Sequence, residues 1–259
     1  AALPTTQAVT VNALPVPTIS GLNTVCAGTT GVSYSTEGGM SAYTWTVSAG
    51  GTITAGAGTN SITVTWNTAG AQTVRVNYNN TNGCSATTPT TYNVTVNALP
   101  VPTITGNTPV CVNSSEVYTT ESGMSAYVWN VTGGTITSGA GTNSVTVNWT
   151  GVGARTISVN YNNGASCPAN TPTSRNITVN ALPLPTITGL ASVCQNASGV
   201  TYTTEAGMSG YTWNVVGGTI TAGAGTRQIA VTWNTVGAQS VSVNYVSNGC
   251  SAALPTTQA

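Results

Sequence analysis

The chain has 259 residues, a formal net charge of zero and 3% charged residues, and it contains no histidine, lysine, aspartate or phenylalanine. General acid–base catalysis uses histidine or closely held carboxylates, calcium sites use clustered carboxylates, zinc sites use close-spaced cysteine or histidine pairs, and nucleic-acid binding uses basic clusters. The composition therefore predicts no catalytic residue, no metal or cofactor site, and no nucleic-acid partner.

The sequence contains three copies of one module. Tyr34, Tyr118 and Tyr202 lie 84 residues apart, and methionines and tryptophans recur at the same spacing. A fixed period of this kind is the signature of a repeat array. The octapeptide AALPTTQA fills residues 1–8 and again residues 252–259. We expect the chain to be a window on a longer string, or a subunit that exchanges a strand with another copy.

Within the first module, short segments of alternating apolar and polar residues predict strands that bury one face. Glycine-rich and asparagine-rich turns separate them. About seven short strands in 84 residues are typical of an immunoglobulin-like sandwich, so the predicted fold is an all-β, elongated tandem array of such modules. The expected strands are residues 18–19, 32–34, 43–47, 52–54, 62–66, 74–78 and 92–96.

The domain boundaries follow from the junctions, each of which reads Asn-Ala-Leu-Pro-x-Pro. Proline fixes φ and favours an extended preceding residue, so each linker should be short and stiff, with modules end to end. We expect residues 1–15 to be the last strand of a preceding module plus a linker. Modules should follow at 16–100, 101–183 and 184–259, the third lacking its last strand. No stretch reaches the length of a membrane span.

Each module carries two cysteines, for which within-module disulfides are the simplest prediction. Two alternatives stay open: bonds across the junctions, Cys84 to Cys111 and Cys167 to Cys194, and six free thiols. The pairs expected within modules are Cys26 with Cys84, Cys111 with Cys167, and Cys194 with Cys250.

The tryptophans carry the one hypothesis of ligand binding. Trp45 lies in the middle of an expected central strand, where a core position is predicted. Trp66, Trp149 and Trp233 each end a strand. Exposure of these three side chains would favour glycan contact, and their burial would dismiss it.

Each module contains the same short motifs in the same order. Those of the first module are Val25-Cys26, Tyr34, Tyr43–Val47, Gly50–Ile53, Val64–Trp66, Val74–Tyr78, Cys84 and Val94–Asn97. This order resembles the PKD-like, immunoglobulin-like repeats of secreted surface proteins from Bacteroidetes. The resemblance implies large exported adhesins or filaments, including gliding-motility adhesins, commonly exported by type IX secretion. The segment Trp45–Gly50 departs from the Trp-x-Phe-Gly-Asp-Gly of the better-known PKD domain.

These features bear on three classes of function. The favoured hypothesis is the shaft of an extracellular filament or cell-surface adhesin. Its partners would be neighbouring modules or identical subunits end to end, with lateral filament contacts or surface glycans as further partners. A glycan-binding accessory module is the alternative. An enzyme is not expected, because the sequence supplies no catalytic groups.

Overall fold

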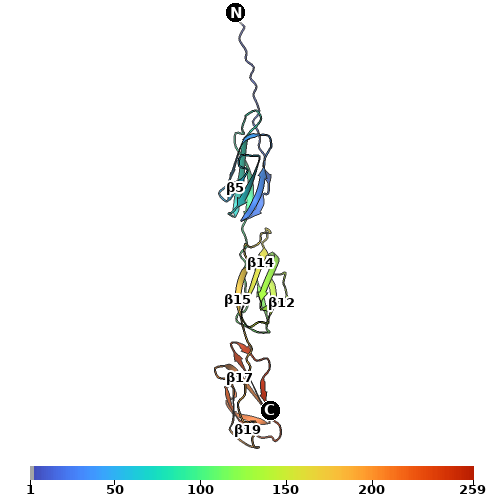
Figure 1. Ribbon diagram of the computed structural model, residues 1–259, viewed down its shortest axis with the longest axis vertical. Coiled ribbons are helices and arrows are strands. Elements are labelled where there is room, and N and C mark those ends of the chain that lie inside the picture. Colours follow the sequence, from blue (N-terminus) through green and yellow to red (C-terminus); the bar gives the residue numbers. More distant parts are fainter. Residues whose placement is uncertain (1–2) are drawn as a thin grey trace. The chain divides into compact units, whose positions relative to one another are not determined.

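The structure is a computed structural model that describes residues 3–259, and strands are the only regular elements in this range (Figure 1). The all-β prediction is confirmed. Two compact units are present, Ala1–Val101 with Tyr161–Asn170, and Pro102–Asn160 with Thr171–Ala259. Residues 1 and 2 of the segment expected at 1–15 lie outside the described residues. Residues 3–259 contain no helix long and apolar enough to cross a membrane.

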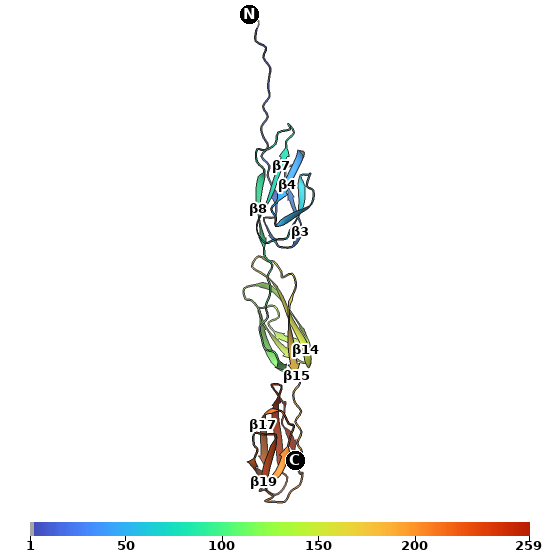
Figure 2. The same ribbon diagram turned by 90° about the vertical axis from the view of Figure 1, so that its left-hand side faces the viewer.

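The first module is a sandwich of two sheets (Figures 1 and 2). Each sheet has four strands, in the orders β1-β3-β6-β5 and β2-β8-β7-β4. Residues 3–19 form no strand, so the strand expected at 18–19 begins two residues later. The strands are β1 (Ser20–Gly21), β2 (Thr24–Cys26), β3 (Thr29–Ser35), β4 (Ser41–Val47), β5 (Gly51–Ala55), β6 (Ser61–Trp66), β7 (Gly70–Asn79) and β8 (Thr90–Asn97).

The second module repeats this plan with sheets β10-β13-β12 and β11-β14-β15-β9. The strands are β9 (Val110–Cys111), β10 (Ser115–Thr119), β11 (Ser125–Thr132), β12 (Gly134–Ser138), β13 (Ser144–Trp149), β14 (Gly153–Asn162) and β15 (Thr173–Asn180).

The third module has sheets β16-β19-β18 and β17-β20-β21, with β22 also paired to β20. Its last strand was expected to be missing, and the structure contains a three-residue strand, β22, at that place. The strands are β16 (Val200–Thr203), β17 (Ser209–Val216), β18 (Gly218–Ala222), β19 (Gln228–Trp233), β20 (Ser240–Ser247), β21 (Cys250–Ser251) and β22 (Thr256–Gln258).

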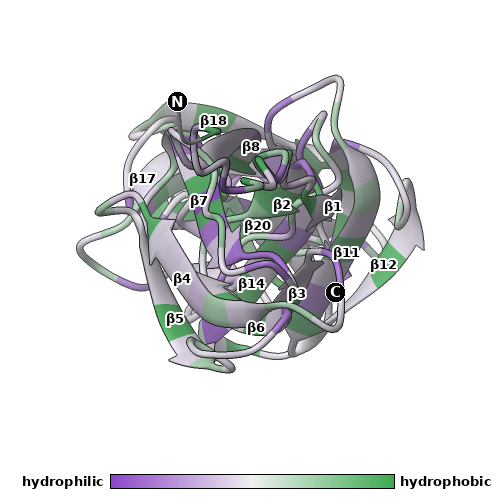
Figure 3. Ribbon diagram, turned by 90° about the horizontal axis from the view of Figure 1, so that it is seen from above, coloured by the Kyte–Doolittle hydropathy of each residue, from purple (hydrophilic) through white to green (hydrophobic). Residues whose placement is uncertain are grey.

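Alternation along the strands builds each core, because side chains two residues apart share a face. In β6 the burial alternates residue by residue, and the strands in Figure 3 show alternating bands of hydropathy. Both sheets of the first module contribute to one cluster of buried side chains, and Trp45 belongs to it as predicted. Its other members include Tyr34, Trp66, Ile62, Val64, Val76 and Val94.

One parallel strand pair holds the first cysteine of a module in place. The short strand β2 runs parallel to the end of β8, with Val25 opposite Val96, whereas the other ladders of this module are antiparallel. In the second module, β9 pairs with β15 in the same way. The first cysteine therefore lies beside the carboxyl end of the last strand.

The hairpin between β5 and β6 yields a stability prediction. Gly56 has φ of +81°, and a Cβ atom there would lie 2.0 Å from the Ser61 carbonyl oxygen, whereas a Cβ on Gly58 would have nothing within 4 Å. We expect Gly56→Ala to lower the free energy of unfolding by about 1–3 kcal/mol. Gly58→Ala should change it by less than about 0.5 kcal/mol. Denaturant titration of both variants measures this, and equal effects would contradict the assignment.

Candidate functional site: the covalent junctions

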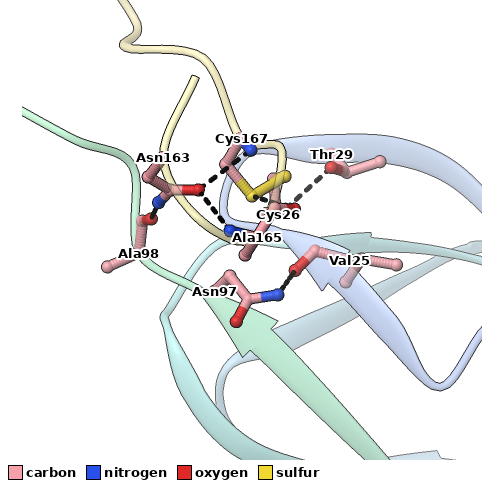
Figure 4. Close-up of a disulfide and its surroundings, with 8 residues drawn as sticks. All are labelled: Val25, Cys26, Thr29, Asn97, Ala98, Asn163, Ala165 and Cys167. Atoms are coloured by element: carbon pink, nitrogen blue, oxygen red, sulfur yellow. Dashed lines mark hydrogen bonds between the residues drawn. A yellow bond between two sulfur atoms is a disulfide. The ribbon is translucent and has the colours of Figure 1, made fainter. Parts of the chain in front are cut away.

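Two disulfides join cysteines that are far apart in the sequence. Cys26 bonds Cys167 with a Cα–Cα distance of 5.6 Å, and Cys111 bonds Cys250 at 5.7 Å. In both, the first cysteine of one module bonds the second cysteine of the following module. Figure 4 shows the first bond, between the end of β2 and the loop that follows β14.

The predicted within-module pairing is therefore wrong for the bonded cysteines, and the alternative of bonds from Cys84 to Cys111 and from Cys167 to Cys194 is wrong as well. The register of the first module gives the reason. Cys26 lies opposite Asn97, at the end of β8, while Cys84 follows β7 near the beginning of β8. An eight-residue strand spans on the order of 25 Å, and a disulfide needs Cα atoms within about 7 Å.

The second cysteine of each disulfide is the buried one. Cys167 and Cys250 are 0% and 1% exposed, while the bonded Cys26 and Cys111 and the free Cys84 are half-buried and the free Cys194 is exposed. Neither Cys84 nor Cys194 has a disulfide partner within residues 3–259. The prediction that all six cysteines form disulfides is thus corrected to four in this structure.

An asparagine before the second cysteine orders the loop that carries it. The Asn163 Oδ1 atom accepts hydrogen bonds from the backbone N–H groups of Ala165 and Cys167, both at 3.0 Å. Its Nδ2 atom donates to the Ala98 carbonyl oxygen at 2.8 Å, in the linker that follows β8 (Figure 4). One side chain therefore positions the cysteine and holds the linker.

The first module repeats this arrangement. Asn80 accepts hydrogen bonds from the backbone of Asn82 and Cys84 at 3.0 Å, and it donates to the Ala13 carbonyl oxygen at 3.0 Å. In the third module the loop is one residue shorter, and there Asn180 donates from the linker to the Asn248 carbonyl oxygen at 2.8 Å. Sequence reasoning missed these asparagines, although the shared Asn-x-x-x-Cys spacing of the first two modules could have revealed them.

A glutamate fixes the other end of each linker. The Glu37 carboxylate accepts hydrogen bonds from Thr18 N at 3.1 Å and from the Thr18 and Thr36 hydroxyl groups, and Tyr78 donates to it at 3.0 Å. Thr18 directly follows the Pro-x-Pro segment. Glu121 binds Thr103 and Glu205 binds Thr186 in the same way.

These hydrogen bonds set the charge state of the carboxyl groups. Burial alone would raise the pKa, but the bonds from the two threonines outweigh it and lower the pKa of Glu37, Glu121 and Glu205 to about 2. Burial and the neighbouring carboxylate raise the pKa of Tyr78 to about 12. The sequence showed these three glutamates only as the charged residue shared by the modules; their place after a Tyr-Thr-Thr or Tyr-Ser-Thr run was the available signal.

The three tryptophans considered for glycan contact lie in the cores. Trp66 and Trp149 are 0% exposed and Trp233 is 7% exposed. The Trp66 indole N–H donates to the Tyr34 hydroxyl at 3.1 Å, in an edge-to-face contact with that ring. By the criterion set from the sequence, this burial dismisses these three side chains as sugar-stacking surfaces.

The motif pattern matches a described domain over nearly the whole chain. Residues 12–94, 97–179 and 180–258 each match the PKD-like domain. The chain belongs to the PKD-like domain family. This confirms the resemblance drawn from the sequence, at the level of the domain. No curated protein matches this chain.

Several solved structures resemble the array of PKD-like modules. FdeC, an Escherichia coli adhesin, is 18% identical, with 93% of this chain and 95% of that chain covered and a TM-score of 0.33. The D00-D0 domain of Intimin is 13% identical, with 62% and 98% covered and a TM-score of 0.33. The bacterial integrin-binding protein invasin is 15% identical, with 94% and 59% covered and a TM-score of 0.29. Likeness at these values carries no functional assignment.

The carboxylates of the PKD-like modules predict an acid-dependent stability. A folded pKa near 2, against an ordinary value of 4.5, stabilises the modules above pH 4.5, and this contribution is lost as the pH falls towards 2. The thermal midpoint should therefore be level from pH 7 to about 5 and fall below it.

Substitutions distinguish the effect of the three linker glutamates on acid stability from that of Glu116, the fourth glutamate. Replacing Glu37, Glu121 and Glu205 together by glutamine should lower the midpoint at pH 7 and flatten its fall in acid. Glu116 is the control position, because its carboxylate accepts a hydrogen bond from Asn107. The variant Glu116→Gln should show the same fall of the thermal midpoint in acid as the unmodified chain. A triple variant with the acid dependence of the unmodified chain would contradict the assignment.

The disulfide pairing can be tested by peptide mapping under non-reducing conditions. We expect linked peptides that contain Cys26 with Cys167 and Cys111 with Cys250. Cys167→Ser should leave Cys26 as a thiol and keep the second bond, because the two bonds form independently. Recovery of a Cys26–Cys84 peptide from the unmodified chain would refute the structure at this point.

Proposed function

We propose that this chain is a structural repeat segment, the shaft of an extracellular filament or a large cell-surface adhesin, in which PKD-like modules are reinforced covalently. The observation that carries this proposal is the overlap of the two disulfides. Cys111 lies inside the loop closed by Cys26 and Cys167, and Cys167 lies inside the loop closed by Cys111 and Cys250. Disulfides that joined cysteines within modules would not have this property.

The overlap creates three parallel covalent paths between the bonded pairs. They are the chain segments from Cys26 to Cys111, from Cys111 to Cys167 and from Cys167 to Cys250. A single backbone cut between Cys26 and Cys250 leaves the two ends connected. A segment under tension or exposed to proteases outside a cell gains directly from this redundancy.

Each bond also closes a long loop, with sequence separations of 141 and 139 residues. By the chain-entropy model, one loop of this length stabilises the folded state by about 5 kcal/mol. Disulfides of this kind persist in oxidising compartments. The persistence of the bonds therefore supports a place outside the cytosol.

The charged groups support a structural role as well. Three of the four glutamates hold threonines at the linkers, and Arg155 and Arg175 donate to backbone carbonyl oxygens. Within residues 3–259, no three cysteine or acidic side chains form a metal-binding group. The proposal therefore includes no reaction.

The finer parts of the proposal come from the family resemblance. They are a source in the Bacteroidetes, export by type IX secretion, and a gliding adhesin or a related filament. Neighbouring modules or identical subunits would be the partners along the shaft, with lateral contacts between shafts as a further partner class. A glycan-binding accessory role would need residues other than Trp66, Trp149 and Trp233, because these are buried.

Force measurement tests the reinforcement. The shortest path between the bonded pairs has 56 residues (167 minus 111), against 224 residues (250 minus 26) in the reduced chain. At about 3.4 Å per residue, the stretch from Cys26 to Cys250 should extend to about 190 Å when oxidised and about 760 Å when reduced. Equal extension in the two states would contradict the reinforced shaft.

Immunogold labelling tests the location. Antibodies raised against the folded chain should label intact, unpermeabilised cells, at repeated positions along filaments or surface projections. Antibody pre-absorbed with the purified chain is the control. Label that appears only after permeabilisation would overturn the proposal.

A further inference from the structure

We propose that the Asn163 side chain positions Cys167 beside Cys26 before their disulfide exists, so that the folded modules select the pairing and oxidation comes last. The reaction that makes the junction is then a thiol oxidation of folded modules, and it needs no disulfide isomerisation. Three features of the structure lead to this inference: the order of the cysteines along the chain, the hydrogen bonds of the loop that carries Cys167, and the unequal exposure of the bonded cysteines.

The observed pairing is disfavoured in an unfolded chain. Cys84 and Cys111 lie between Cys26 and Cys167 in the sequence. The observed bond closes a loop of 141 residues, against 58 (84 minus 26) for a bond from Cys26 to Cys84. The probability of closing a flexible loop falls with about the 3/2 power of its length, so Cys26 meets Cys84 about four times as often as it meets Cys167. Chain statistics therefore do not produce the observed bond.

The folded modules reverse this preference. Within the first module, strand β8 separates Cys26 from Cys84, whereas the Cα atoms of Cys26 and Cys167 are 5.6 Å apart. The loop Tyr161–Asn170, which carries Cys167, belongs to the same compact unit as the first module. Folding therefore removes the competing cysteine and brings in the observed partner.

The loop that carries Cys167 is closed by local hydrogen bonds between nitrogen and oxygen atoms. The Asn163 N–H donates to the Cys167 carbonyl oxygen, and the Ser166 N–H donates to the Asn163 carbonyl oxygen, both at 2.9 Å. The Asn163 Oδ1 atom accepts two further bonds within the loop. The Asn80 loop of the first module makes the same four bonds at the same spacing. The conformation is therefore a property of the local Asn-x-x-x-Cys sequence.

The time scales place this closure first. A short loop closes within about 100 ns, whereas disulfide formation takes seconds or longer. The hydrogen-bonded loop is therefore complete before its cysteine is oxidised.

One hydrogen bond joins the closed loop to the linker. The Asn163 Nδ2 atom donates to the Ala98 carbonyl oxygen at 2.8 Å (Figure 4). Ala98 directly follows Asn97, which lies opposite Cys26 in the parallel ladder. Cys26 is held by this ladder and by the Thr29 hydroxyl group, which donates to the Cys26 carbonyl oxygen at 2.7 Å. Both cysteines are therefore placed by contacts that do not depend on the bond between them.

The second junction has an equivalent hydrogen bond in which the linker is the donor. Asn180 lies opposite Cys111, and its Nδ2 atom donates to the Asn248 carbonyl oxygen at 2.8 Å, two residues before Cys250. Each disulfide is thus accompanied by one hydrogen bond between a linker and a cysteine loop. Because the two bonds use different side chains, each can be removed without the other.

Unequal exposure sets the direction of the oxidation. Cys26 is half-buried whereas Cys167 is 0% exposed, and Cys111 and Cys250 differ in the same way. A low-molecular-weight disulfide is the oxidant, and it reacts first at the more accessible Cys26, whose thiolate attacks one of its sulfur atoms and releases a small thiolate. The Cys167 thiolate then attacks the Cys26 sulfur, forms the S–S bond and releases the second small thiolate.

This sequence of steps balances. Two protein thiols are oxidised to one disulfide, and one small disulfide is reduced to two thiols. The two protons lost by the cysteines are taken up by the two small thiolates.

The order of events is tested by oxidising the reduced 259-residue chain with oxidised glutathione and mapping peptides from samples quenched with acid at successive times. In buffer, Cys26–Cys167 and Cys111–Cys250 should be the first bonds that these four cysteines make. In concentrated urea, Cys26–Cys84 should exceed Cys26–Cys167 about fourfold. A Cys26–Cys84 bond that forms first in buffer and is later exchanged would overturn the inference. Circular dichroism should show the reduced chain folded in buffer, and an unfolded reduced chain would overturn it as well.

Two aspartate variants test the role of Asn163. Aspartate at this position keeps the acceptor that closes the loop but has no proton to donate to the Ala98 carbonyl oxygen. Asn163→Asp should therefore slow formation of the Cys26–Cys167 bond about tenfold, while the other disulfide of the same molecule forms at the unmodified rate. Asn170→Asp is the matched control, because Asn170 is exposed in the same loop and the variant adds the same charge. It should change neither rate.

The second junction provides the reciprocal variant. Asn180→Asp should slow formation of the Cys111–Cys250 bond about tenfold and leave the other disulfide at the unmodified rate. Equal slowing of both disulfides by either variant would indicate a general loss of stability and would refute a positioning role. Unchanged rates in both variants would refute it too.

Serine variants test the direction of the oxidation. With added oxidised glutathione, Cys167→Ser should carry glutathione at Cys26. Under the same conditions Cys26→Ser should leave Cys167 as a thiol, because the Cys167 side chain is covered. Faster modification of Cys167 than of Cys26 would contradict the assigned direction.

The inference goes beyond the proposed shaft, and the two can fail separately. Disulfides that form through isomerisation would remove the inference but leave the surface labelling and the extension of the oxidised chain unchanged. A chain labelled only inside cells would overturn the shaft and leave the order of folding and oxidation in place.

Discussion

The pairing between the last strand of a module and its short first-cysteine strand is the constraint on which the junctions depend. The carboxyl end of β8 holds β2, and with it Cys26, in a fixed place. The same strand then continues into the linker, whose Ala98 carbonyl oxygen is held by Asn163. The carboxyl end of β8 therefore positions Cys26, and the linker that follows it contacts the loop that carries Cys167. Where this strand is short, in the third module, the neighbouring cysteine segment forms no strand.

The overlapping disulfides follow from this geometry, and they explain why the modules must occur in tandem. The two cysteines of one module lie at opposite ends of its last strand, too far apart to bond with each other. In the second module, Cys111 bonds Cys250 of the third module and Cys167 bonds Cys26 of the first, so this module is part of two covalent loops. Reinforcement thus needs at least two adjacent modules, and its pattern can continue through any number of them.

Charged residues are few in these modules, and the shared glutamates hold the linkers in place. Each shared glutamate binds the backbone and hydroxyl group of the threonine that follows the Pro-x-Pro segment, as Glu37 does with Thr18. These carboxylates are half-buried, and an ionised group that has lost part of its water is stable only when hydrogen bonds replace that water; here threonines supply them. The linker is therefore held at one end by a carboxylate and at the other by an asparagine.

The sequence by itself determined the all-β class, the threefold period, six of the seven expected strands of the first module and the burial of Trp45, because alternation of side chains and turn residues are local properties. It missed the short strand β2, which carries Cys26. The family followed from the same motifs. The partner of Cys26, the burial of Trp66 and the role of Glu37 depended on the tertiary structure. Spacing along the chain gives the number of residues between two cysteines, but strand direction and register decide which of them lie within bonding distance, and those arise only when both sheets are assembled.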